Sequence, residues 1–313
     1  MGFANIHNTK ESNTVRVVSD FRELNKRIVR KPFPIPKIST VLQELEGFTY
    51  ATALDLNMGY YTIRLDPDAS KICTIIVPWG KYSHLRLPMG VACSPNIFQA
   101  KMSELMATLE FVRTYLDDLL CISKGNLDDH LAKLQRVLIR LRHAGLKVNA
   151  CKSCFCAVET EYLGYILSRD GIKPQPKKVR AILALTLPQN VKQLHRFLDY
   201  RDIWARCSKI LAPLSDLAGE CGYTKVMKAN KTKKPWHWDP VHQQAFDTVK
   251  ATITHDVSMA YPDYSQGFEI YTDSSKLQLG AIITQQNRPL AFFSRKLSPA
   301  QQKYSVTNKS YLP

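Results

Sequence analysis

Two adjacent carboxylates, Asp117 and Asp118, lie between two apolar runs and are the residues of this sequence best suited to chemistry. The flanking runs, residues 111–112 and 119–122, are typical of buried strands. Because Asp is a poor strand residue, we expect both acids in a tight turn between two strands. Like charges there are costly unless a cation neutralises them, and Mg²⁺ is a hard ion that oxygen ligands suit. The alternative is a solvated surface turn, since Asp-Asp is also a common turn signal.

A third acid, Asp55, stands in a mostly apolar run, residues 50–56, that precedes the pair in the chain. An acid on a buried strand is either a hydrogen-bonded structural group or a functional one, because an unpaired buried charge is costly. Nucleotidyl transfer by two metal ions uses carboxylates that bridge ions about 3.5–4 Å apart. Asp55, Asp117 and Asp118 would together suit that reaction, with two Mg²⁺ ions or with Mn²⁺.

The charge balance favours a polyanionic partner. The 313 residues include 43 Lys and Arg against 27 Asp and Glu, a net charge of +16. Such an excess suits nucleic acid, although a merely basic protein is the simpler alternative. No apolar run reaches the roughly 18 residues that span a bilayer, and no secretory or myristoylation signal opens the chain. We therefore expect an intracellular protein whose eight cysteines are reduced, with Cys151, Cys154 and Cys156 as free thiols rather than metal ligands.

Hydrophobic periodicity and turn residues predict both strands and helices along the chain. Residues 1–13 are polar, and we predict no strand there. The turn Trp79-Gly80-Lys81 should join two strands, Ser39 should cap a helix, and Gly145 should end one. Residues 223–234 read as a basic linker. The predicted strands are 14–18, 50–56, 62–65, 73–78, 82–87, 267–273, 279–284 and 290–294, with a strand-turn-strand at 161–167. The predicted helices are 38–46, 94–105, 127–144, 177–185, 191–198 and 240–253.

Seven segments stand in an order shared with one known family. They are Val18-Ser19-Asp20-Phe21-Arg22-Glu23-Leu24-Asn25-Lys26, Phe33-Pro34-Ile35-Pro36, Ala53-Leu54-Asp55-Leu56-Asn57-Met58-Gly59-Tyr60, Leu87-Pro88-Met89-Gly90, Ser94-Pro95-Asn96-Ile97-Phe98-Gln99, Tyr115-Leu116-Asp117-Asp118 and Tyr162-Leu163-Gly164. Through these segments the chain resembles the reverse transcriptases of gypsy-like long-terminal-repeat retrotransposons, encoded in Pol polyproteins. The likeness continues into Tyr271-Thr272-Asp273 and Phe293-Ser294-Arg295, which resemble the start of the family's ribonuclease H domain.

The resemblance implies an α+β fold, namely a right-hand polymerase with fingers, palm and thumb, followed by a partial ribonuclease H-like α/β domain. Residues 1–168 would form fingers and palm, residues 169–235 the thumb, connection and basic linker, and residues 236–313 the ribonuclease H-like part. It implies that Asp55, Asp117 and Asp118 are catalytic metal ligands. The other implied roles are the metal-site motif (Tyr115, Leu116), the dNTP contacts (Arg16, Lys10, Tyr60, Met89), the primer grip (Leu163, Gly164) and a ribonuclease H metal acid (Asp273).

The chain departs from the family pattern in three places. No strand is predicted before Arg16, so we expect incomplete fingers. Residues 197–201 run together two thumb motifs that the family separates. Ser310 stands where the family carries a glutamate ligand of ribonuclease H, so we expect a truncated domain without that activity.

The resemblance implies RNA- and DNA-directed DNA synthesis, with dNTPs as substrates and an RNA template, a DNA primer and an RNA/DNA hybrid as partners. It implies no membrane, and a place in a cytoplasmic retroelement particle or the nucleus. A homodimer and a parent Gag-Pol polyprotein are both left open. The main alternative is a decayed, non-catalytic fragment that at most binds nucleic acid. A cellular RNA-binding protein of unrelated fold is a third class.

Overall fold

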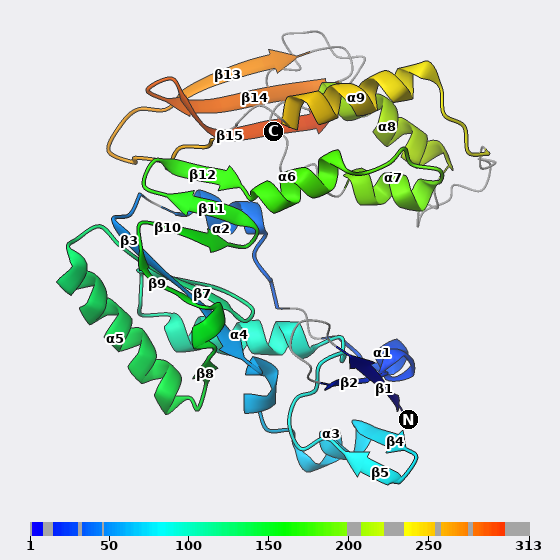
Figure 1. Ribbon diagram of the computed structural model, residues 1–313, viewed down its shortest axis with the longest axis vertical. Helices are drawn as coiled ribbons and strands as arrows, with labels where there is room; N and C mark the ends of the chain where they lie inside the picture. Colours follow the sequence, from blue (N-terminus) through cyan, green and yellow to red (C-terminus); the bar gives the residue numbers. More distant parts are fainter. Residues whose placement is uncertain are drawn as a thin grey trace. The chain divides into compact units, whose positions relative to one another are not determined.

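The structure is a computed structural model, and it describes residues 2–8, 15–30, 33–45, 47–198, 208–221, 235–253, 258–274 and 278–297 (Figure 1). The chain divides into two compact units. The N-terminal unit comprises residues 1–41 and 48–163, and the C-terminal unit comprises residues 42–47 and 164–313. No helix in the described ranges is both long and apolar enough to cross a membrane.

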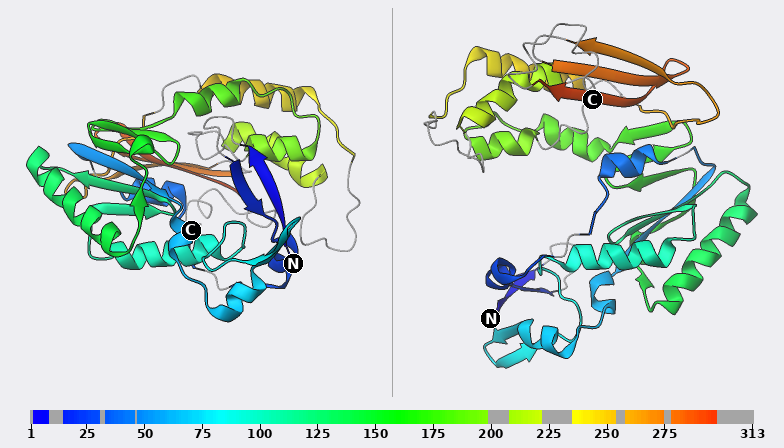
Figure 2. Two further views of the ribbon diagram at one scale, coloured as in Figure 1. Left: turned by 60° about the horizontal axis from the view of Figure 1, so that its bottom comes forward. Right: turned by 180° about the vertical axis from the view of Figure 1, so that it is seen from behind.

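An antiparallel sheet forms the centre of the N-terminal unit. Its order is β6-β7-β3-β8, and β9 also pairs with β3. Helices α4 and α5 contact this sheet (Figures 1 and 2). The apolar side chains of these helices share one buried cluster with those of β3 and β7. The bounds are β3 Tyr50–Asn57, β6 Val112–Tyr115, β7 Asp118–Ser123, β8 Lys147–Val148, β9 Cys154–Ala157, α4 Ser94–Met106 and α5 Leu127–His143.

Local capping sets both ends of α5, at Gly145 as predicted and at Asn126, for which no capping role was predicted. The side chain of Asn126 accepts a hydrogen bond of 2.9 Å from the Asp129 N–H, which satisfies a free donor of the first turn. At the other end Gly145 has φ +69°, a conformation that glycine adopts without steric cost. The stripe of Leu134, Val137 and Leu141 is buried against the core between these ends.

A second sheet of this unit corrects the prediction for the start of the chain. Its order is β2-β1-β4-β5, with β1 at Gly2–Asn8, β2 at Val15–Ser19, β4 at Thr74–Val77 and β5 at Gly80–Ser83. The prediction that residues 1–13 carry no strand was wrong, and it was the reason for expecting incomplete fingers. β1 pairs antiparallel with β2 and parallel with β4, so backbone hydrogen bonds on both sides outweigh its weak local propensity.

Three smaller predictions in this unit were also wrong. Most of the strand predicted at 62–65 is absent, because a 3₁₀ turn spans Gly59–Thr62 and only an isolated bridge joins Arg64 to Arg86. The β4–β5 hairpin closes at Val77 and Gly80, so its turn is Pro78-Trp79. Helix α2, Ile38–Gln43, already contains Ser39, and the Val41 N–H donates to the Lys37 carbonyl, so Ser39 is not its cap.

Shorter helices and strands complete the N-terminal unit. Helix α1 spans Arg22–Arg27 and α3 spans Pro67–Ile72, where the Asp66 side chain caps the first turn by accepting from the Asp68 N–H. A short 3₁₀ turn at Ala150–Lys152 precedes β9, and β10 spans Glu159–Tyr162.

In the C-terminal unit, four helices share one apolar core. They are α6 Pro176–Leu183, α7 Val191–Leu198, α8 Ser208–Cys221 and α9 Pro240–Ile253. Leu194, Phe197, Leu214, Phe246 and Val249 meet in that core. Strand β11 Tyr165–Ser168 pairs with β12 Gly171–Pro174, and β13 Glu269–Ser274, β14 Gln278–Gln285 and β15 Arg288–Lys296 form an antiparallel sheet (Figure 2).

A fully buried histidine joins the central sheet to α5. His130 Nε2 lies 2.8 Å from the Thr52 hydroxyl of β3, and Nδ1 lies 2.8 Å from the Ser123 hydroxyl of β7. Each hydroxyl can donate or accept, so the neutral ring is fully hydrogen-bonded. Burial lowers the pKa of His130, because it disfavours the charged imidazolium.

This buried imidazole makes folding sensitive to acid. Its folded-state pKa lies below the unfolded value near 6.5, so the unfolded chain binds more protons in mild acid. We expect the melting midpoint to fall between about pH 7.5 and about pH 5.5, and to fall less in His130→Gln. Scanning calorimetry of both proteins at both pH values measures this, and equal falls would contradict it.

Candidate active site

Asp55 and Asp118 face each other across two neighbouring strands. The register of β3 and β7 pairs Asp55 with Asp118, the first residue of β7. Directly opposed residues of an antiparallel pair project from the same face with Cβ atoms about 4.5–5.5 Å apart. Both carboxylates are partly buried. Burial, and then the charge of Asp55, raises the pKa of Asp118. The sheet therefore holds two acids where their joint ionisation is disfavoured.

Asp117 lies in the hairpin turn as predicted, whereas Asp118 does not. Tyr115 and Asp118 close the β6–β7 hairpin, so the turn is Leu116-Asp117 and Asp118 already belongs to the strand. The Asp117 carboxylate lies against the 3₁₀ turn, where a Cβ on Gly59 would stand 2.8 Å from Oδ1. Burial, and then the charge of Asp117, raises the pKa of Tyr60 to about 12. In the described part of the chain, no choice of one carboxylate oxygen each from Asp55, Asp117 and Asp118 brings all three oxygens within 4.8 Å of one another.

The Asp turn is held by a side chain from α4. Leu116 has φ +52°, a left-handed conformation that costs a non-glycine residue about 1–2 kcal/mol. Its N–H donates to Gln99 Oε1 at 2.6 Å, and Gln99 Nε2 donates to the Thr114 carbonyl at 3.2 Å. Gln99 is 1% exposed. This amide therefore fixes the turn from beneath.

Sequence reasoning named Gln99 only as the end of a shared segment and did not assign it a role. The available signal was its place in the apolar stripe of α4, between Phe98 and Met102, which are both buried. A polar residue on the buried face of a helix needs a partner, and here that partner is the turn of the acid hairpin.

Hydrogen bonds also fix the backbone around Asp55. The Asp55 N–H donates to Ser153 Oγ at 3.1 Å, and Ser153 Oγ donates to the Asn149 carbonyl at 2.7 Å. The Asn149 N–H returns to the Asp55 carbonyl at 2.8 Å. The Leu56 N–H donates to the Asp117 carbonyl at 3.0 Å, which ties β3 to the acid turn.

Gly59 lets the 3₁₀ turn approach this site closely. A Cβ there would lie 2.5 Å from Phe98 Cζ as well as against the Asp117 carboxylate, so no larger residue fits. Met58, just before it, has φ +53°. Tyr60 is 9% exposed and packs on Phe98 with ring centroids 5.1 Å apart. Met89 is partly buried against the apolar cluster that contains Tyr60 and Phe98. Two of the four predicted nucleotide contacts, Tyr60 and Met89, therefore also pack with the core.

Leu163 and Gly164 form the turn between β10 and β11. Both have left-handed backbones, with φ +49° and +81°. A Cβ on Gly164 would overlap Lys178 Nζ, which also lies 5.2 Å from the centre of the Tyr165 ring. Burial lowers the pKa of Lys178. A basic group thus lies beneath the predicted primer grip.

Tyr162 is a further residue that sequence reasoning did not single out. It is 3% exposed, and its hydroxyl has no hydrogen-bond partner among the described residues. Burial, and then the charge of Asp118, raises its pKa. A buried hydroxyl therefore lies within electrostatic reach of the acid pair.

Several predicted residues lie outside the described side chains. The backbone of Arg16 pairs with His7 between β2 and β1, and Asp273 pairs with Gly280 between β13 and β14, but neither side chain is described. Lys10, Ser310, residues 199–201 and the predicted linker at 223–234 also fall outside the described ranges.

Comparison with known proteins adds the family. Residues 7–167 match the sequence model of a family described as reverse transcriptase (RNA-dependent DNA polymerase), and residues 238–313 match that of the RNase H-like domain found in reverse transcriptase. The chain is 33% identical to the retrovirus-related Pol polyprotein from transposon opus of Drosophila melanogaster, over 95% of this chain and 30% of that protein. It is 32% identical to the retrovirus-related Pol polyprotein from transposon gypsy of the same organism, over 95% of this chain and 29% of that protein. The chain thus spans less than a third of these relatives.

Solved structures agree on the fold. A foamy viral protease-reverse transcriptase in complex with dsDNA has a TM-score of 0.80 at 21% identity, covering 98% of this chain and 64% of that one. The same enzyme in complex with an RNA/DNA hybrid has a TM-score of 0.79 at 21% identity, covering 98% and 41%. The chain has the α+β fold of a polymerase of this class followed by an RNase H-like domain.

The opposed acids predict a gain in stability from Asp118→Asn. A carboxyl whose folded-state pKa is raised destabilises the folded protein once it is ionised at neutral pH. Removing that charge should therefore raise the melting midpoint of the metal-free protein. Asp128→Asn is the matched control, because that exposed acid favours the first turn of α5 and its loss should not stabilise. A lower midpoint for Asp118→Asn than for the wild type would contradict this reading.

The Gln99 brace predicts a specific loss of stability. Gln99→Leu leaves the Leu116 N–H without its acceptor, which should cost about 1–3 kcal/mol. Gln135→Leu, the same change at an exposed position of α5, should cost much less. Urea denaturation followed by circular dichroism compares the two, and equal losses would exclude a bracing role.

Proposed function

Because the chain belongs to the reverse transcriptase family, we propose that it extends a primer 3′ hydroxyl with dNTPs, copying RNA or DNA. The observation that carries this proposal is the cross-strand pairing of Asp55 with Asp118, beside a hairpin turn that presents Asp117. Transfer of a nucleotidyl group requires positioning and charge stabilisation more than covalent chemistry. A braced cluster of acids on a rigid sheet suits that task.

The acids fit a pair of hard divalent cations. Asp55, Asp117 and Asp118 offer oxygen ligands only, which Mg²⁺ and Mn²⁺ prefer. The raised pKa of Asp118 supports this assignment, because an adjacent cation would relieve the charge repulsion from Asp55. When bound, the ions would activate the primer hydroxyl and neutralise charge that develops on the triphosphate.

The remaining roles follow the family pattern and belong to the same proposal. Arg16 and Lys10 would contact the triphosphate, and Tyr60 and Met89 would lie against the sugar and base. Tyr115 and Leu116 would position the two hairpin acids. The left-handed turn at Leu163 and Gly164, with Lys178 beneath it, would hold the primer end.

We assign residues 1–168 to fingers and palm, 169–235 to thumb, connection and linker, and 236–313 to the RNase H-like part. The family matches at 7–167 and 238–313 support this division. The net charge of +16 and the nucleic-acid complexes of the foamy viral enzyme support an RNA template, a DNA primer and their hybrid as partners. The Pol polyprotein relatives support a longer parent polyprotein. A Gag-Pol product, and action in a cytoplasmic retroelement particle or the nucleus, belong to the proposal through the family resemblance.

Primer extension tests the proposal. The folded chain should extend oligo(dT) on poly(rA) in Mg²⁺, and Asp117→Asn should lower the rate at least about a hundredfold, since metal-held charge stabilisation is worth several kcal/mol. Asp128→Asn, an exposed acid of α5, should keep the wild-type rate. Binding of the primer-template by the folded wild type without extension, unchanged by Mg²⁺, would support a non-catalytic binding fragment instead.

A further inference from the structure

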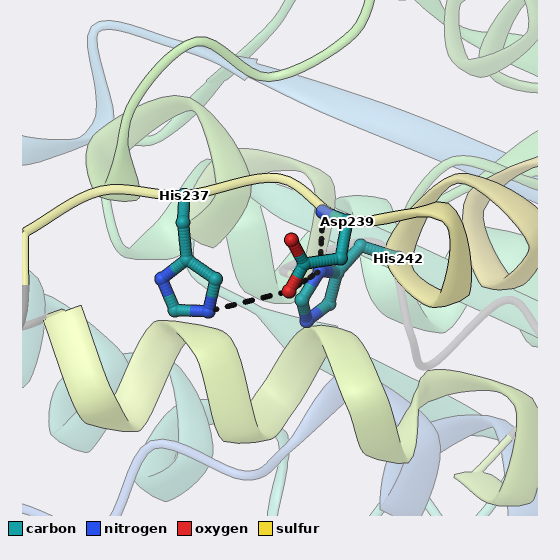
Figure 3. A group of neighbouring side chains, drawn as sticks. All are labelled: His237, Asp239 and His242. Carbon is teal, nitrogen blue, oxygen red and sulfur yellow. Dashed lines mark hydrogen bonds and ion pairs between the residues drawn. The ribbon is translucent and has the colours of Figure 1, made fainter.

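A second group of metal-ligating side chains lies in the C-terminal unit, at the start of α9. His237 and Asp239 precede the helix, and His242 stands in its first turn (Figure 3). In the described part of the chain, this is the one set of three His, Cys, Asp or Glu residues whose ligand atoms all lie within 4.8 Å of one another. Cys151, Cys154 and Cys156 form no such group there.

The distances suit a first-row transition metal. His237 Nε2 lies 3.7 Å from Asp239 Oδ2, and His242 Nδ1 lies 3.9 Å from the same oxygen. Metal–ligand bonds of about 2.0–2.2 Å in a tetrahedral site place ligand atoms roughly 3.3–3.6 Å apart. These two separations exceed that range by only a few tenths of an ångström, and the ligand nitrogens of the two histidines lie within 4.8 Å of each other.

The ring of His237 is oriented as a ligand should be. Its Nδ1 lies 3.3 Å from the Pro235 carbonyl, to which an Nδ1–H can donate, and Nε2 then keeps a free lone pair 3.7 Å from Asp239 Oδ2. Ligating histidines commonly donate their second ring N–H to a carbonyl in this way. His237 and His242 also pack together, with ring centroids 5.6 Å apart.

The neighbouring tryptophans anchor the segment. Trp236 and Trp238 stack with centroids 6.0 Å apart, and both pack on the core of the C-terminal unit. Trp238 Nε1–H donates to Gln243 Oε1 at 3.1 Å, which ties the segment to α9. Exposed fractions of 38% for the His237 side chain and 59% for that of Asp239 leave room for a water ligand.

Helix capping is the competing explanation for His242. Its Nδ1 accepts the Asp239 N–H at 3.0 Å, as a Glu or Gln does in a capping box. If His242 bound the metal through Nδ1, it would lose the hydrogen bond from the Asp239 N–H and gain a bond to the ion. Capping does not account for His237. A cation also opposes the dipole of the helix N-terminus, which should weaken binding about two- to fivefold.

We propose that His237, Asp239 and His242 bind one Zn²⁺ ion, with water as the fourth ligand. Two imidazoles and a carboxylate suit Zn²⁺ rather than Mg²⁺, which prefers oxygen ligands. The ion would tie the Trp236–Trp238 segment to the first turn of α9. This structural role is independent of the acids of the polymerase site.

The test uses the full chain freed of metal by EDTA, with Zn²⁺ followed by calorimetry and Co²⁺ followed by absorption. We expect one Zn²⁺ per chain with Kd about 1 µM or tighter, and a tetrahedral Co²⁺ spectrum without a thiolate band. His237→Gln should weaken binding at least about tenfold, while Cys151→Ser should not change it. Zn²⁺ should raise the melting midpoint of the wild type and of Cys151→Ser, but not that of His237→Gln.

His242→Gln separates the site from the cap. A glutamine can still accept the Asp239 N–H, so the metal-free variant should melt like the wild type while losing the response to Zn²⁺. Zn²⁺ binding that is unchanged in His237→Gln would overturn the proposal. So would a thiolate band that disappears in Cys151→Ser, or the absence of stoichiometric binding by the folded wild type.

Discussion

The structure depends on one unfavourable arrangement, the cross-strand pairing of two carboxylates between largely buried apolar residues. Asp55 and Asp118 are cross-strand partners, and the residues beside them in β3 and β7, Leu54 and Leu119, are almost fully buried. Because the side-chain period of a strand is two, burying those leucines fixes which face carries the acids. The apolar core therefore holds two like charges together, and their repulsion is what a divalent cation would relieve.

Much of the surrounding structure holds this contact rigid. Gln99 braces the left-handed turn, Ser153 and Asn149 bond to the backbone of Asp55, and Gly59 admits the 3₁₀ turn beside Asp117. His130 ties β3 and β7 to α5 beneath the sheet. Three left-handed non-glycine residues, Met58, Leu116 and Leu163, stand in the segments assigned to the site. Such backbone strain is common where function needs a preorganised geometry.

The sequence predicted the elements whose patterns are local. Helix α9 and most of α5 lie where the periodicity placed them, and Asp55 lies on its predicted strand. It did not predict β1, because that strand is stabilised by its pairing with β2 and β4 and not by its own residue pattern. Strand β4 lies about 70 residues further along the chain, so no local pattern can reveal this pairing. The acid turn was assigned one residue late, since the pair of acids concealed that Asp118 already pairs with Tyr115. Gln99 required the knowledge that α4 lies under the turn.

The pKa of Asp118 tests the account most directly. Carboxyl ¹³C NMR can follow its titration in the wild type and in Asp55→Asn, each with and without Mg²⁺. We expect a pKa above the ordinary value near 3.9 in the metal-free wild type, and a fall both in Asp55→Asn and on addition of Mg²⁺ to the wild type. A pKa that is the same in both proteins and does not respond to Mg²⁺ would contradict the claim that this pair is built to bind a cation.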